Sequence, residues 1–392
     1  MKPLSALKYY WENKKKASLI AVILLLIVLA ISAIQSMVVS GFDSSEATTL
    51  RYLQKASIVF SPSGGSFLSD ETMGKIEDFE GVKEIIPIDE FEQTVYNSII
   101  APTESIVLFS DRINSTQELM DRFGLSIKDG RLPNNNEYEI VMHEDLLLNK
   151  GLKIGDEFGG EVDENEWMQG RYKIVGSLKG KNILSFGTKN FGIEMWKDSF
   201  RGTLDESDIE TIFGQPRVVL VFPKDSIEQM NSNLQTLDKN QAQLLTYEIR
   251  YSNLEGEISS IQNVLGIILT IVLIAMGVSV GAIIMIAYNE RKSEFGILSA
   301  IGYSKRDIVK LVCKEIGLLS LVCTAIGYGI SMFLLFILNI SMFAPAGKPL
   351  TLFSSLGLIF TLIVPVVVFV CSIVPIIRQL KKTDLVSVIE GR

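Results

Sequence analysis

Side chains that commonly perform catalysis are few in this chain, and none stands in a catalytic pattern. His143 is the only histidine, and the three cysteines (Cys313, Cys323 and Cys371) lie in or beside long apolar runs. A single histidine without a nucleophile or a second base indicates a structural role more often than a catalytic one. Zinc-hydrolase, dithiol, serine-hydrolase and phosphate-loop motifs are absent from the sequence. The chain is therefore predicted to have no catalytic residues, to be no enzyme and to hydrolyse no ATP by itself.

Acidic side chains are the other chemical feature. Residues 159–166 are rich in carboxylates but lack the alternating ligand spacing of a calcium loop, so we interpret them as solvated and predict no metal site. Residues 43–257 carry 21 Lys and Arg against 38 Asp and Glu. This excess could attract cationic substrates or could be an ordinary soluble surface, and we favour the second interpretation.

Binding to another protein is the chemistry that residues 289–315 indicate. This charged segment lies between two long apolar runs. Phe295, Leu298 and Ile301 recur three apart, with Ile297 and Ala300 alongside, which predicts a helix with one apolar face.

A second helix is predicted directly after the first. Gly302 is expected at the end of the first helix, since glycine enters the left-handed region without steric cost. Ser304 and Asp307 have the spacing of a capping box. The second helix would carry a basic face along the membrane surface before it enters the bilayer. That interfacial basic face consists of Arg306, Lys310 and Lys314. An ordinary positively charged connection between two membrane spans is the alternative.

The elements that must position this segment are four apolar runs, each longer than the roughly 20 residues that a helix needs to cross a bilayer. They predict transmembrane helices over residues 17–42, 258–289, 316–340 and 353–377. The rest would be a cytoplasmic interfacial helix (1–16), an outer domain (43–257), a coupling loop (290–315), an outer loop (341–352) and a tail (378–392). The predicted fold class is thus an α-helical membrane protein with a large α+β extracytoplasmic domain inserted between the first and second of four transmembrane helices.

Charge predicts the orientation. Residues 1–16, 290–315 and 378–392 together carry 15 Lys and Arg against seven acidic residues. The positive-inside rule therefore places both termini in the cytoplasm and residues 43–257 outside. A cleavable signal peptide is the rival interpretation of the N-terminus, but its apolar run is too long and no small-residue cleavage site follows.

Within the outer domain, strand-like and helix-like segments alternate. Strands are predicted at residues 56–60, 82–88, 94–100, 105–109, 139–142, 171–176 and 218–222. Helices are predicted at residues 69–79, 117–123, 143–151 and 226–237. Residues 243–251 would form a last strand or a stalk, and both ends of the domain would continue into the first two spans.

Gly277 and Gly281 form a G-x-x-x-G element in the second predicted span. Small residues four apart allow close approach of helices. The sequence leaves open whether this face packs within the chain or forms a homodimer.

Residues 294–308 resemble the cytoplasmic-loop signature of the FtsX/MacB-type ABC transporter permeases, usually a form of R-E-I-G-I-L-R-A-L-G-A. Ser293 and Ser299 depart from it, standing where the family often has arginine. Three segments of the outer domain look like the MacB-type core domain, namely residues 130–133, 139–142 and 151–156. Residues 385–389 in the tail are similar to the usual P-V-E-A-L ending.

The resemblance implies that two permease copies pair with two copies of a separate ABC ATP-binding subunit, which binds ATP and Mg, in a bacterial cell membrane. A coupling helix would dock on that subunit, with Phe295, Leu298 and Ile301 in a groove. The implied ATPase-coupling residues are Glu294, Phe295, Gly296, Ile297, Leu298, Ala300, Ile301 and Gly302. Motion would pass to the outer domain (mechanotransmission) and expel or extract an amphiphilic or peptide-like substrate, with or without a membrane-fusion or adaptor protein. No cofactor in this chain and no nucleic-acid partner are expected.

Two other functions fit the sequence less well. The first is an FtsX-like transmembrane signalling scaffold that regulates a cell-wall hydrolase, although that branch usually has a smaller outer domain. The second is a membrane enzyme, which the lack of a nucleophile–base set disfavours.

Overall fold

The computed structural model describes residues 14–61, 67–110, 113–353 and 355–382, which form two compact units. The first unit contains the chain before residue 40, residues 259–340 and the chain after residue 349, and the second unit contains residues 40–258 and 341–349. Most of the predicted interfacial helix (1–16) and of the tail (378–392, including 385–389) lies outside the described residues.

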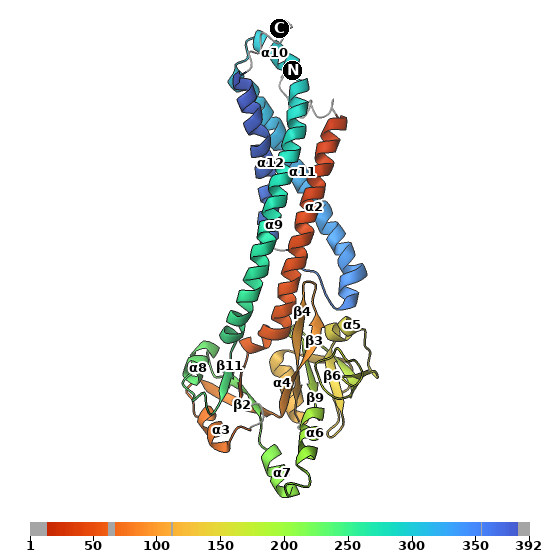
Figure 1. Ribbon diagram of the computed structural model, residues 1–392, viewed down its shortest axis with the longest axis vertical. Helices are drawn as coiled ribbons and strands as arrows, with labels where there is room; N and C mark the ends of the chain where they lie inside the picture. Colours follow the sequence, from red (N-terminus) through yellow and green to blue (C-terminus); the bar gives the residue numbers. More distant parts are fainter. Residues whose placement is uncertain (1–13, 62–66, 111–112, 354, 383–392) are drawn as a thin grey trace. The chain divides into compact units, whose positions relative to one another are not determined.

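The first unit is a bundle of long helices (Figure 1). The four long helices are α2 (Lys14–Ser45), α9 (Tyr247–Glu290), α11 (Lys305–Leu338) and α12 (Ser355–Lys382). The short α10 (Lys292–Ala300) lies between α9 and α11. All four long helices are long and apolar enough to cross a membrane, which confirms the four predicted spans with a large domain between the first and second. A shared core contains Leu24 of α2, Val280 of α9, Ile316 of α11 and Val368 of α12.

Apolar side chains also cover the outside of the bundle. Ile271 and Val278 of α9, Phe333 of α11 and Val366 of α12 are each more than half exposed. These helices are apolar both on the face that packs in the core and on the exposed face. Apolar side chains on all sides are typical of a helix that spans a bilayer.

The second unit contains two sheets. Its strands are β1 (Ser57–Phe60), β2 (Val82–Ile88), β3 (Glu90–Asn97), β4 (Pro102–Phe109), β5 (Ser126–Gly130), β6 (Glu139–His143), β7 (Glu157–Phe158), β8 (Tyr172–Lys179), β9 (Leu184–Gly187), β10 (Val218–Pro223) and β11 (Gln243–Leu245). One sheet has the order β11-β1-β10-β2, and the other has the order β3-β4-β9-β6-β8-β5, with β7 beside β8. The chain crosses from one sheet to the other at Asp89, between β2 and β3.

Helices complete this unit. They are α3 (Asp70–Glu77), α4 (Ile113–Phe123), α5 (Glu144–Lys150), α6 (Phe191–Phe200), α7 (Glu206–Phe213) and α8 (Ile227–Leu234), with short irregular turns at η1 (Glu46–Leu50), η2 (Arg51–Gln54), η3 (Asn339–Phe343) and η4 (Ala344–Ala346). The buried face of α4, which includes Leu119 and Phe123, belongs to a core cluster that draws on both sheets, with Leu220 from β10 and Leu108 from β4.

Several sequence predictions are confirmed and several are wrong. The strand at Val82–Ile88 agrees to the residue, but the strand predicted at 94–100 runs over Glu90–Asn97. Residues 243–251 divide between the two predicted alternatives, because β11 covers Gln243–Leu245 and α9, which continues into the second span, begins at Tyr247. The missed strands β5 and β9 are only five and four residues long, too short for a clear period of two.

The connection between α11 and α12 belongs to the second unit, which the sequence did not indicate. Residues 341–349 cluster with that unit, and the hydroxyl of Tyr96 donates a hydrogen bond to the carbonyl of Gly347. Gly347 has φ +63°, and a Cβ there would lie 2.1 Å from the carbonyl oxygen of Asp145 in α5. Backbone packs on backbone here, and only glycine fits.

The variant Gly347→Ala should release residues 341–349 from α5, because the added methyl group meets main-chain atoms that cannot rotate away. Hydrogen exchange of those residues should rise by at least about tenfold. Gly151→Ala is the matched control, since Gly151 has φ +69° with open space around its Cβ position. This control should lower the free energy of unfolding only by the about 1–2 kcal/mol that the left-handed backbone conformation costs an L-residue. Equal exchange of residues 341–349 in both variants would contradict the docking.

Candidate functional site

The corner between α10 and α11 is the best-defined part of the predicted coupling segment. The N–H of Gly302 bonds to the carbonyl of Ser299 and the N–H of Tyr303 to that of Leu298, which is a Schellman motif. Gly302 has φ +105°, as its predicted place after a helix requires. Ser304 and Asp307 form the predicted capping box at the start of α11. Both helix ends are therefore fixed by local hydrogen bonds.

The prediction that Phe295 seats in a partner's groove is wrong. Its side chain is fully buried in the bundle of this chain. The ring stacks on Tyr288 of α9, with 5.1 Å between centroids, and the Arg291 guanidinium lies 4.8 Å from its centroid. Leu298 is half-buried against the same core. The apolar face predicted for a partner is mostly the face that holds α10 onto the bundle.

A buried ion pair joins the α9–α10 corner to α11, and the sequence analysis missed it. Arg291 Nη1 lies 2.6 Å from Glu315 Oε2, and the Glu315 side chain is 4% exposed. A second hydrogen bond joins Nη2 to Oε1 at 3.3 Å, and Arg291 Nε also donates to the exposed Glu294 at 3.1 Å. The sequence did contain a signal for this ion pair. Glu315 is the one acidic residue on the buried face of α11, which Ile308, Leu311, Val312 and Ile316 otherwise form.

The outer face of α10 carries the remaining predicted residues. Ile297 is 54% and Ile301 70% exposed, with Glu294 and Ala300 beside them. We call these four residues the outer strip of α10. Gly296 is buried on the opposite side, and Gly302 is exposed at the corner.

The basic residues Arg306, Lys310 and Lys314 are all exposed on α11, as their spacing predicts. However, the separate interfacial helix that was to contain them does not form. α11 continues without a break from Lys305 to Leu338, because its apolar face runs directly into the bundle core.

The glycines of α9 pack against α12 within the chain, which is one of the two alternatives that the sequence left open. A Cβ on Gly281 would lie 2.8 Å from the carbonyl oxygen of Cys371 in α12, and one on Gly277 would lie 2.8 Å from Val367. α12 already covers this face.

His143 has the structural role that the sequence predicted. Its Nδ1 accepts a hydrogen bond from the N–H of Asp145 at the start of α5, its Nε2 lies 3.2 Å from the carbonyl oxygen of Gly180, and the ring is buried. Burial lowers the pKa of this imidazole below its usual range, so the ring is held neutral and caps the helix.

Residues 266–383 match the family description "FtsX-like permease C-terminal". They include α10, α11, α12 and more than half of α9. This part of the chain is an FtsX-like permease domain.

The chain is also similar to an uncharacterized ABC transporter permease, YknZ of Bacillus subtilis (strain 168), with 26% identity over 212 residues, 53% of this chain and 52% of the relative. It thus spans about half the length of this curated relative. Among solved structures, the periplasmic region of MacB from Actinobacillus actinomycetemcomitans gives a TM-score of 0.27 at 10% identity, covering 51% of this chain and 92% of that one. The extracellular domain of YknZ from Gram-positive bacteria gives 0.24 at 15% identity, covering 46% and 88%.

The variant Glu315→Gln should destabilise the bundle by about 3 kcal/mol, since it leaves the Arg291 charge buried without its main counter-charge. The loss should appear as a lower midpoint when the purified protein is unfolded by increasing SDS in mixed micelles.

Glu294→Gln is the control, because it neutralises the exposed partner of the same arginine. Its effect should stay within about 1 kcal/mol. If both variants unfold at the same midpoint, the buried pair does not stabilise the corner.

Proposed function

We propose that this chain is the permease subunit of an ABC transporter of the FtsX/MacB type. In this proposal α10 lies in the cytoplasm and docks on a separate ATP-binding subunit, which binds ATP and Mg. The observation that carries the proposal is the outer strip of α10: two isoleucines stay exposed on a short helix whose other face is locked to the bundle.

The physical argument is that a coupling element must be rigid on one side and available on the other. Phe295 and the Arg291–Glu315 pair fix the inner side, so a push on α10 moves α9 and α11 with it. Ile297 and Ile301 lie one turn apart on the outer side, which suits insertion of a helix into an apolar groove of a partner.

The orientation rests on charge. Arg306, Lys310 and Lys314 are exposed next to the outer strip, and an excess of basic residues marks the cytoplasmic side. The termini would then be cytoplasmic and residues 43–257 extracytoplasmic.

Continuous helices supply the path for motion. α9 is one helix from Tyr247 to Glu290, about 66 Å long at 1.5 Å per residue. Its first residues belong to the second unit and its last residues adjoin α10. Closure of two ATPase copies below two permease copies would thus act on the outer domains, and thereby expel or extract an amphiphilic or peptide-like substrate, with or without an adaptor protein.

The variants Ile297→Arg and Ile301→Arg should each abolish at least about nine-tenths of the stimulation that the permease gives to its partner ATPase, because a charge replaces an apolar anchor. Stability should change by less than about 0.5 kcal/mol, since both side chains are exposed. ATP hydrolysis by the co-purified complex in nanodiscs is the measurement.

Ile297→Leu and Ile301→Leu are the matched controls and should keep full stimulation. Unchanged hydrolysis and co-purification in the arginine variants would remove α10 as the docking element. If the unaltered permease stimulates its ATPase but deletion of the permease gene produces no transport phenotype, the signalling-scaffold function is favoured instead.

A further inference from the structure

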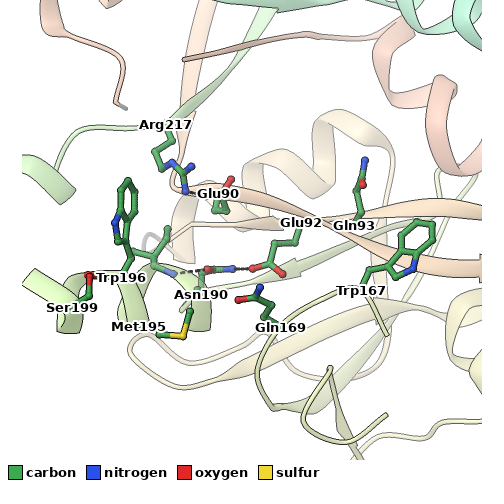
Figure 2. Close-up of a pocket in the computed structure, with 12 residues that line it drawn as sticks. Glu90, Glu92, Gln93, Trp167, Gln169, Asn190, Met195, Trp196, Ser199 and Arg217 are labelled. Atoms are coloured by element: carbon green, nitrogen blue, oxygen red, sulfur yellow. Dashed lines mark hydrogen bonds and ion pairs between the residues drawn. The ribbon is translucent and has the colours of Figure 1, made fainter. Parts of the chain in front are cut away.

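A cavity of about 740 Å³ lies in the second unit, where β3, α6 and the loop before β8 meet (Figure 2). It is built from two carboxylates of β3, an arginine before β10, and polar and apolar side chains of α6 and the loop. The lining residues used below are Glu90, Glu92, Trp167, Asn190, Met195 and Arg217. None of them belongs to the outer strip of α10.

Glu92 is the polar centre of this cavity. Its carboxylate accepts a hydrogen bond from the Asn190 side chain. Among the described residues no Lys, Arg or His lies within ion-pair distance of it, whereas the carboxylate of Glu166 is near enough to repel it. Burial raises the pKa of Glu92 above its usual range. Because no described cation pairs with it, this half-buried carboxylate lacks the counter-charge that buried acids normally have.

The second carboxylate is already neutralised. Glu90 forms an ion pair with Arg217, and burial, partly offset by that arginine, raises the pKa of Glu90. The guanidinium of Arg217 also lies over the Trp196 ring, 5.2 Å from its centroid. One positive and two negative groups leave the cavity with a net charge of −1 when both carboxylates are ionised.

Trp196 is not free to hold a ligand on its ring faces. Phe67 stacks on it at 5.8 Å, and Arg217 lies over its ring. By contrast, Trp167 and Met195 are 56% and 54% exposed although both line the cavity. Figure 2 places Trp167 on one side of Glu92 and Met195 on the other. An exposed tryptophan beside an uncompensated carboxylate is a combination that favours organic cations.

We propose that this cavity binds the ammonium group of a cationic amphiphile, with the charge paired to Glu92 and the apolar body against Trp167 and Met195. The hydrogen bond from Asn190 orients the carboxylate toward the ligand. A cation here would supply the counter-charge that the described residues do not. The site is independent of the proposed coupling function, because binding needs neither the partner ATPase nor ATP.

The test uses the full chain in nanodiscs and three probes with the same six-carbon body: hexylammonium, hexanol and hexanoate. Tryptophan emission should change saturably with hexylammonium and should lack a saturable change with the other two. Glu92→Gln keeps the shape of the side chain and removes its charge, so it should weaken hexylammonium binding by at least about tenfold. Trp167→Ala alters an exposed side chain without disturbing a core, and should also weaken binding when followed by calorimetry.

Glu77→Gln is the matched control, since it removes one negative charge from an exposed position on α3. It should bind hexylammonium as the unaltered chain does. The proposal is overturned if Glu92→Gln and Glu77→Gln bind hexylammonium equally well, or if hexanoate binds as tightly as hexylammonium. ATPase stimulation should be unchanged in Glu92→Gln without ligand, so that this result and a failure of the docking proposal are told apart.

Discussion

The contact between Arg291 and Glu315 decides how the α9–α10–α11 corner is built. Taking both charges out of water is costly, and removing either partner leaves the other uncompensated. The corner is therefore stable only when α10 lies with this pair against α11. In this arrangement the Phe295 ring is buried in the core between Tyr288 and the guanidinium of Arg291. One face of α10 is thereby committed to the bundle, which leaves Ile297 and Ile301 as its exposed apolar side chains.

The domain between α2 and α9 has a comparable constraint. Its first residues continue from α2 and its last residues lead into α9, and residues 341–349 join it as a third segment through Tyr96 and Gly347. The α11–α12 connection therefore packs on α5 as part of this domain.

The two proposed sites differ in their physical character. The outer strip of α10 is mostly apolar, and the opposite face of the helix is fixed to the bundle, which suits a protein surface. The cavity around Glu92 has a half-buried carboxylate with no described cation paired to it, and exposed apolar side chains, which suits a small charged amphiphile. The outer strip of α10 lies in the FtsX-like domain, and the cavity around Glu92 lies in the inserted domain. Residues of one site can therefore be substituted without changing the other site.

The sequence alone determined what depends on local order along the chain. It predicted the four apolar helices, the glycine at 302, the capping box at Ser304 and a structural role for His143, because length, periodicity and cap chemistry act within a few residues. Only the tertiary structure decided which face of α10 is buried, that Gly277 and Gly281 pack on α12, and that no described Lys, Arg or His pairs with Glu92. These depend on residues tens of positions apart, such as the 24 that separate Arg291 from Glu315, and helical spacing indicates an apolar face without indicating what covers it.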